Sequence, residues 1–215
     1  MAFFLNVPAW LKYGNMKIFI DPDDAKRSNF GAFYQPPIID ATGCRLPVSV
    51  PEQLKSRWCW AAIASALATY YQTMNISQVE IADSLLSDNL SSDPVAGNGR
   101  YANEELLERN VNFKLDVALK YVNCFSHWTI GKPIFERVQF EINQGRPLGV
   151  RLEWFKGGAH YILVNGYCDQ EKSIMIEDPL HGKSIQVYDQ FPDTYRESGA
   201  VWTESFFTNK LTNNI

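Results

Sequence analysis

Residues 53–71, QLKSRWCWAAIASALATYY, place a single cysteine between two tryptophans, directly before a run of small and apolar residues. From Trp60 onward these residues recur at intervals of three and four, which is the helical period. We therefore expect a central, buried helix that begins near Cys59. The first turn of a helix has unpaired backbone N–H groups and the positive end of the helix dipole, and both favour a thiolate. Cys59 is thus a candidate nucleophile.

The chain before residue 147 has mainly helical patterns. Ser77 and Glu80 have the spacing of a capping box, which predicts the start of a second helix. A later helix is expected to stop before Gly145 and Pro147. Turn-forming residues predict an exposed loop over residues 87–102. The expected helices span residues 60–71, 77–86, 103–109, 114–121 and 132–143.

After residue 147 the apolar period changes to that of strands. The expected strands, separated by turns rich in Gly, Pro and Asp, span residues 148–154, 160–167, 173–177, 184–188 and 200–205. Residues 46–50 form at most a short edge strand, because prolines stand at positions 47 and 51. Helices first and strands after predict an α+β fold. In it a helical layer, whose central helix carries the cysteine, packs on a C-terminal antiparallel β-sheet.

The size of the chain suits one domain with an extension, since it has 215 residues of which 46% are hydrophobic. Residues 1–45 contain short apolar pieces broken by Gly, Pro and charged residues. We expect them to form an N-terminal extension, such as a propeptide or targeting segment. The domain is then expected over residues 46–208, with a C-terminal tail over residues 209–215.

The formal net charge of −4 argues against nucleic acid or an anionic membrane as a partner. No apolar run approaches the roughly 18 residues that span a bilayer, and the N-terminus lacks the basic segment of a cleavable signal. We therefore expect a cytoplasmic protein, while export by a route that reads no such signal stays open. The oligomeric state is also open.

The four cysteines are widely spaced and include no CxxC pair, which excludes a zinc ribbon and a dithiol redox motif. If Cys59 stays free, the other three cannot all pair within the chain, so a reducing compartment is the simpler expectation. No metal or organic cofactor is implied.

His160 is the candidate base for Cys59. It stands in GGAHYILVNGY, at the start of a strand expected to form a hairpin with the next one. A turn centred on Asp169 would place His160 opposite Asp178 on the same face, whereas a slip of one residue would reverse that facing. Such an acid fixes the histidine tautomer and stabilises the imidazolium. Cys59, His160 and Asp178 are therefore the predicted nucleophile, base and orienting acid.

Gln53 precedes Cys59 by six residues, so its carboxamide can donate to a developing oxyanion together with the Cys59 backbone N–H. The candidate substrate-binding residues flank the cysteine and the histidine: Trp58, Trp60, Gly158 and Ala159. For Trp60, packing beneath the helix is an equally physical alternative.

These residues occur in the chain order of the papain-like cysteine peptidases, which the chain resembles. It is similar in particular to the compact bacterial branch, with its AvrRpt-type avirulence effector peptidases and bacteriocin-processing peptidases. The segments that carry the resemblance are WCWAA, GRPLGVRLEW, GGAHYILVNGY, IEDP and a late segment with Tyr195, Gly199 and Trp202, and it spans about residues 46–208. The resemblance implies a papain-like fold and a thiol peptidase that acts on peptide or protein substrates through a Cys-His-Asp triad and a thioacyl-enzyme intermediate.

The same resemblance implies self-cleavage between Gly31 and Ala32, within NFGAF, whereas an ordinary loop glycine is the alternative. Two other functions stay open. One is an isopeptide or cell-wall amidase, or an acyltransferase, that uses the same triad. The other is a catalytically silent module that binds a peptide.

Overall fold

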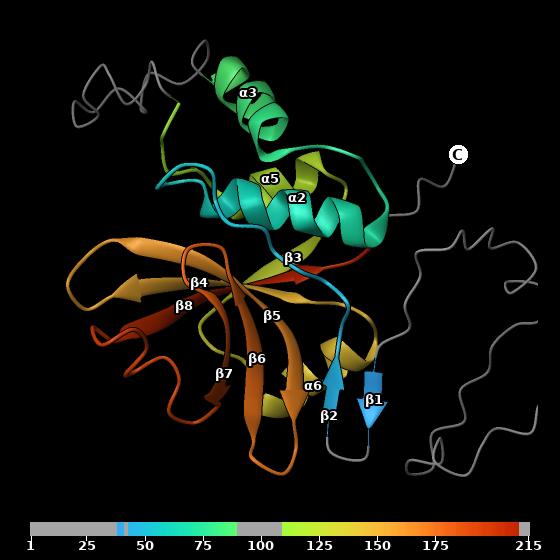
Figure 1. Ribbon diagram of the computed structural model, residues 1–215, viewed down its shortest axis with the longest axis vertical. Coiled ribbons are helices and arrows are strands. Elements are labelled where there is room, and N and C mark those ends of the chain that lie inside the picture. Colours follow the sequence, from blue (N-terminus) through green and yellow to red (C-terminus); the bar gives the residue numbers. More distant parts are fainter. Residues whose placement is uncertain (1–37, 41–42, 90–108, 211–215) are drawn as a thin grey trace, which may run out of the picture. The chain divides into compact units, whose positions relative to one another are not determined.

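The computed structural model describes residues 38–40, 43–89 and 109–210 (Figure 1). In these ranges the helices are α2 (Cys59–Tyr71), α3 (Gln78–Asn89), α5 (Leu115–Tyr121) and α6 (Phe135–Asn143). The strands are β1 (Ile38–Asp40), β2 (Gly43–Arg45), β3 (Phe125–Ile130), β4 (Leu148–Trp154), β5 (Ala159–Cys168), β6 (Ser173–Asp178), β7 (Gly182–Val187) and β8 (Ala200–Thr208). The fold is therefore α+β, as the sequence predicted.

The starts of α3 and α6 follow from the residues that precede them. The N–H of Ser77 donates to Glu80 Oε2 (2.8 Å) and the N–H of Glu80 donates to Ser77 Oγ (3.3 Å), which is the predicted capping box before α3. Helix α6 begins later than predicted, because Pro133 disfavours a helical backbone at Lys132. The helix predicted over residues 103–109 lies almost wholly outside the described residues, as does most of the loop predicted over 87–102. No helix in the described ranges is long and apolar enough to cross a membrane.

The strands form one eight-stranded antiparallel sheet in the order β1-β2-β5-β4-β8-β3, with β6 and β7 continuing from β5. Strand β5 is central because β4 and then β2 pair along one of its edges and β6 pairs along the other. Strand β7 pairs with β6. The hairpin of β5 and β6, which carries the candidate base and acid, thus lies in the middle of the sheet.

Two parts of the sheet differ from the sequence-based expectation. Strand β3 was not predicted. Strands β1 and β2 fall within residues 1–45, which were expected to be an extension, yet β2 pairs with β5. Residues 46–50 form no strand, and the N–H of Leu46 instead donates to the carbonyl of Asn165 in β5 (2.7 Å).

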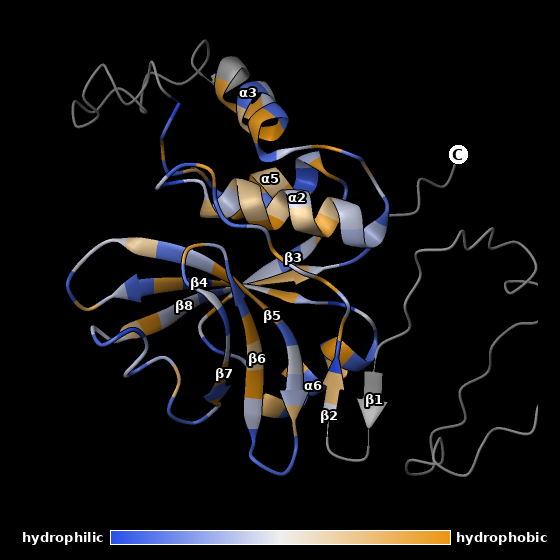
Figure 2. Cartoon of the chain, viewed as in Figure 1, coloured by the Kyte–Doolittle hydropathy of each residue, from blue (hydrophilic) through white to orange (hydrophobic). Residues whose placement is uncertain are grey.

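Helices pack on both faces of the sheet. The strand registers put Gly149 and Phe207 on opposite faces, since neighbouring residues of a strand alternate. A Cβ at Gly149 would lie 3.1 Å from Leu115, so α5 covers the first face. The guanidinium of Arg137 in α6 lies 4.8 Å from the centroid of the Phe207 ring, so α6 covers the second. Figure 2 shows the apolar segments of α2 and β6 that contribute to the core.

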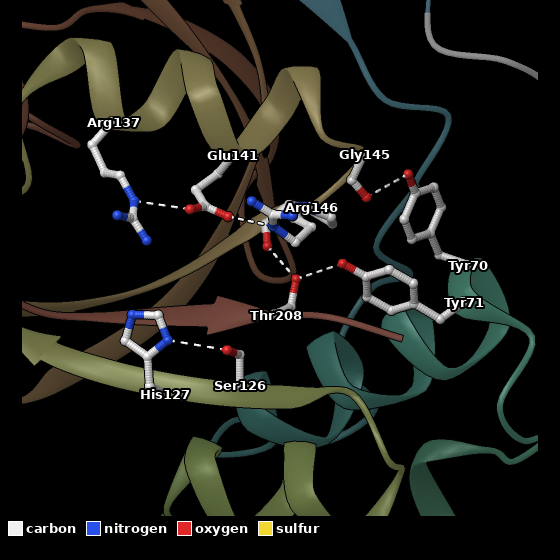
Figure 3. A network of polar contacts seen from close by, with 10 residues as sticks. Tyr70, Tyr71, Ser126, His127, Arg137, Glu141, Gly145, Arg146 and Thr208 are labelled. Atoms are coloured by element: carbon white, nitrogen blue, oxygen red, sulfur yellow. Dashed lines mark hydrogen bonds and ion pairs between the residues drawn. The ribbon is translucent and has the colours of Figure 1, made fainter. Parts of the chain in front are cut away.

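Helix α2 is held at both ends. At its C-terminal end the Tyr70 hydroxyl donates to a carbonyl in the α6–β4 loop (2.9 Å), and the Tyr71 hydroxyl bonds with that of Thr208 (2.8 Å) (Figure 3). At its N-terminal end Trp60 Nε1 donates to a carbonyl in the segment before α5 (3.1 Å). These bonds hold the two ends of α2 against the rest of the fold.

Candidate active site

Cys59 is the first residue of α2 and is buried. The first helical bond runs from the N–H of Ala62 to the carbonyl of Trp58 (3.0 Å), so the N–H groups of residues 59–61 precede the helical ladder. Trp58, the N-cap residue, gives them no side-chain hydrogen bond, and the first turn contains no acidic residue. The positive end of the helix dipole is therefore not neutralised from within the helix, which favours an anion at the Cys59 thiol.

His160 lies near the start of β5 and is also buried. Its Nε2 is 2.8 Å from Asp178 Oδ1, and its ring is within hydrogen-bonding reach of the Cys59 thiol. Because Nε2 faces the carboxylate, Nδ1 is the ring nitrogen left for the thiol. The structure thus brings Cys59, His160 and Asp178 together in the order that the sequence suggested.

The register of the hairpin differs from the predicted one. The pairing of β5 with β6, extended by one residue, places Asp178 opposite Ile162 and not opposite His160. The two side chains still meet, because residues 160 and 162 share a face. A β-bulge at Asn165 makes this possible: without the extra residue, Asp178 would stand opposite Leu163 and point to the other face.

Asp178 is fully buried and has a donor on each carboxylate oxygen. Oδ1 accepts from His160 Nε2 (2.8 Å) and from the backbone N–H groups of Leu180 (2.8 Å) and His181 (3.0 Å). Oδ2 accepts from the hydroxyl of Tyr195 (2.8 Å). The same aspartate therefore forms the turn after β6 and orients the imidazole.

The charges of His160 and Asp178 stabilise each other. Burial favours the neutral imidazole, but the hydrogen bonds with Asp178 and Cys59 outweigh it and raise the pKa of His160 to about 9. Burial likewise favours the neutral carboxyl, but the hydrogen bond and the charge of His160 outweigh it and lower the pKa of Asp178 to about 2. The pair is therefore ionised at neutral pH.

Gln53 is buried in the loop before α2. Its backbone N–H donates to the carbonyl of Pro179 (2.8 Å), which ties this loop to the turn that follows Asp178. Its Nε2 donates to the carbonyl of Lys55 (2.9 Å), and its Oε1 is buried without a hydrogen-bond partner in the described part of the chain. An amide nitrogen carries two hydrogens, so one remains beyond the bond to Lys55.

The four candidate substrate-binding residues have two kinds of environment. Trp58 is buried and its Nε1 donates to the carbonyl of Arg109 (2.7 Å). Trp60 has 0% exposure, so it packs in the core, which was the alternative left open for it. Gly158 and Ala159 are exposed directly beside His160.

Sequence reasoning gave no role to two aromatic residues of the site. The indole of Trp154 stacks on the ring of His160, with centroids 6.1 Å apart, and on the ring of Tyr195, with centroids 6.0 Å apart. Tyr195 belongs to the late segment of the resemblance, which was the only signal for it. Within residues 38–40, 43–89 and 109–210, no group of three or more His, Cys, Asp or Glu side chains could hold a metal ion.

Comparison with known proteins gives one family. The chain is similar to a solved double glycine motif protease from an AMS/PCAT transporter, in complex with the leader peptide, with 15% identity over 81% of this chain and 99% of that chain and a TM-score of 0.40. It is also similar to the Pseudomonas avirulence protein AvrPphB, with 10% identity over 72% of this chain and 92% of that chain and a TM-score of 0.38. Likenesses this distant carry no information about the chemistry of the chain. No curated protein sequence matches it.

The family model described as "Peptidase_C39 like family" matches residues 45–207, which is most of the chain. The resemblance to the compact papain-like peptidases is confirmed by this match, and the chain belongs to the Peptidase_C39 like family.

Proposed function

We propose that the chain is a cysteine peptidase with Cys59 as nucleophile, His160 as acid and base, and Asp178 as the acid that orients His160. The observation that carries the proposal is a series of three groups: the Cys59 thiol at the start of α2, the His160 imidazole beside it, and the fully buried carboxylate that is hydrogen-bonded to that imidazole. A structural cysteine needs no such series, whereas a nucleophile needs a base held in place. Membership of a peptidase family supports the same conclusion.

In the proposed reaction the His160 imidazolium favours the thiolate form of Cys59. The thiolate sulfur attacks the carbonyl carbon of the peptide bond, and the C=O electron pair moves to oxygen. When that pair returns, the C–N bond breaks and His160 gives its proton to the departing amine. A water then loses a proton to His160 and attacks the thioacyl carbon. The C–S bond breaks, which releases the carboxyl product and restores the thiolate and imidazolium.

The negative oxygen formed in each step needs donors that are already in place. The N–H of Cys59 precedes the helical ladder, and we assign it as one donor. We assign the second Nε2 hydrogen of Gln53 as the other, because the Gln53 loop is tied to the turn beside the catalytic acid.

The proposed substrate is a peptide or protein. The exposed backbone of Gly158 and Ala159 beside His160 is the proposed contact for the substrate main chain. Trp58 and Trp60 are too deeply buried for this role.

The domain is proposed over residues 46–208, with a tail over residues 209–215 and an extension over residues 1–45 whose strands β1 and β2 join the sheet of the domain. The bond between Gly31 and Ala32, proposed for self-cleavage, lies outside the described residues. We place the enzyme in a reducing compartment, because three cysteines beside a free Cys59 cannot all pair within the chain.

An unbiased cleavage profile tests the proposal. The purified chain is incubated under reducing conditions with a peptide library derived from a proteome, and new termini are read by mass spectrometry, with Cys59→Ala as the matched control. Cleavage at a consistent sequence that is lost in Cys59→Ala supports a peptidase. Transfer of the acyl group to an added amine without net hydrolysis identifies an acyltransferase, and isopeptide cleavage alone identifies an amidase. No reaction with any of these substrates by folded protein would leave only a binding module.

A further inference from the structure

We infer that Tyr195 is a positioning residue of the proposed active site, whose hydroxyl holds Asp178 and whose ring supports His160 through Trp154. This inference rests on the proposed function, because it assigns a task within the same site. Four side chains form a closed circuit of contacts: His160 to Asp178, Asp178 to Tyr195, Tyr195 to Trp154, and Trp154 back to His160.

The two carboxylate oxygens of Asp178 accept different numbers of hydrogen bonds. Oδ1 accepts from His160 and from two backbone N–H groups. Within the described part of the chain, the hydroxyl of Tyr195 is the donor to Oδ2 (2.8 Å). Since the Asp178 side chain has 0% exposure, water cannot replace a lost donor there. The Tyr195 hydroxyl therefore keeps the carboxylate both ionised and oriented.

The ring of Tyr195 contacts Trp154, which in turn contacts His160. Its plane is nearly parallel to the Trp154 indole, at 7°, and the indole lies at 20° to the His160 ring. Offset parallel rings at these distances attract each other, and a packed indole restricts rotation of the imidazole. Tyr195 thus fixes the acid by a hydrogen bond and the base by packing.

The segment that carries Tyr195, residues 188–199 between β7 and β8, is itself held in one conformation. Lys132 Nζ donates to the carbonyl of Phe191 (2.6 Å), and the N–H of Gly199 donates to the carbonyl of Tyr195 (3.1 Å). Gly199 has a φ of +65°, and a Cβ there would lie 2.1 Å from the carbonyl oxygen of Asp193. A free surface loop needs none of these constraints.

The hydroxyl remains a donor across the range in which the site would work. Burial, reinforced by the Asp178 charge, raises the pKa of Tyr195 to about 12. The other titratable or charged groups beside this circuit are Cys59 on α2, His181 in the turn after β6, and Arg196, whose guanidinium lies 4.9 Å from the Tyr195 ring centroid. A pH profile must therefore be compared between variants and not read alone.

The test measures the rate at which iodoacetamide alkylates Cys59 from about pH 5 to about pH 10, in the full folded chain, with mass spectrometry to separate Cys59 from the other cysteines. Tyr195→Phe removes the hydroxyl and keeps the ring. Tyr71→Phe is the matched control, because it removes a buried hydroxyl bond (2.8 Å) at the far end of α2. Trp154→Leu removes the ring contact and keeps the hydroxyl.

In the wild type we expect the alkylation rate of Cys59 to change in the alkaline range, where His160 loses its proton. Tyr195→Phe should move this change down by about one pH unit and slow alkylation near pH 9 by about 3- to 10-fold, since Asp178 then supports the imidazolium less well. Trp154→Leu should slow alkylation with a smaller shift, and Tyr71→Phe should keep the wild-type profile.

An unchanged profile in folded Tyr195→Phe overturns the inference and leaves the proposed function standing. A wild type whose Cys59 shows no His160-linked rate contradicts the proposed function itself. If Tyr195→Phe does not fold, Tyr195→Met, which also lacks the donor but fills space flexibly, takes its place. The same unchanged profile in that variant overturns the inference.

Discussion

The ion pair of His160 and Asp178 should make the stability of the fold depend on pH in a defined window. The pKa of His160 is raised to about 9, from an ordinary value near 6.5. A group whose pKa is higher in the folded state stabilises the fold fully below its unfolded value, and this stabilisation is lost as pH rises to the folded value. The expected loss therefore falls between about pH 6.5 and pH 9.

The size of the effect follows from the difference between the two values. About 2.5 pKa units at ~1.4 kcal/mol each give a ceiling on the order of 3 kcal/mol. The lowered pKa of Asp178, about 2, results from the same ion pair with His160. It therefore adds no second contribution to the stability between about pH 6.5 and pH 9. The lowered pKa of Asp178 predicts instead that the fold loses stability as pH falls from the ordinary aspartate pKa toward about 2.

The assay is urea unfolding under reducing conditions at a series of pH values. His160→Gln, which does not titrate, is the control for every other group in the protein. We expect the unfolding free energy of the wild type, minus that of His160→Gln, to fall steadily from near pH 6.5 to near pH 9. A difference that stays flat across this window would refute the ion pair, whatever the absolute stabilities.

Three other changes have defined outcomes. Asp178→Asn keeps an acceptor for His160 but removes the charge, so alkylation of Cys59 near neutral pH should slow by about 10- to 100-fold, and a wild-type rate would show that the charge is dispensable. Gly199→Ala should destabilise the fold by about 2 kcal/mol more than Gly157→Ala in urea unfolding. Both glycines have positive φ, but a Cβ at Gly157 meets nothing within 4 Å, so equal losses would contradict the close contact at Gly199. Ser77→Ala should lower the unfolding free energy by about 1 kcal/mol, because α3 loses its capping box, and no loss would mean that another group caps the helix.

Elements with a buried face could be predicted from the sequence. Helix α2 shows a helical period because nearly all of its residues pack in the core. Strand β4 has the predicted bounds because it pairs with β5 and β8 along its two edges, and its large apolar residues occupy every second position. Strand β3 was missed because it lies at the sheet edge, where residues 126–130 are all exposed and no alternation of polarity is needed.

The contacts of the site could be predicted only in part. Local patterns brought Cys59, His160 and Asp178 to attention, but the meeting of the last two depends on the bulge at Asn165, which no turn signal marks. Tyr195 is 17 residues from Asp178 in an irregular segment, and its hydrogen bond is set by tertiary packing alone. Periodicity predicts which face a residue occupies, whereas the partner across a loop is determined by the whole fold.

The most direct test of the central claim is labelling by an electrophilic epoxysuccinyl peptide, with the modified residue located by mass spectrometry. The catalytic assignment predicts one adduct, on Cys59, which is absent in Cys59→Ala and much reduced in His160→Ala. Circular dichroism of each variant verifies that the fold is intact. Folded wild-type protein that takes up no probe, or His160→Ala protein that reacts at the wild-type rate, would contradict the assignment of Cys59 as a nucleophile activated by His160.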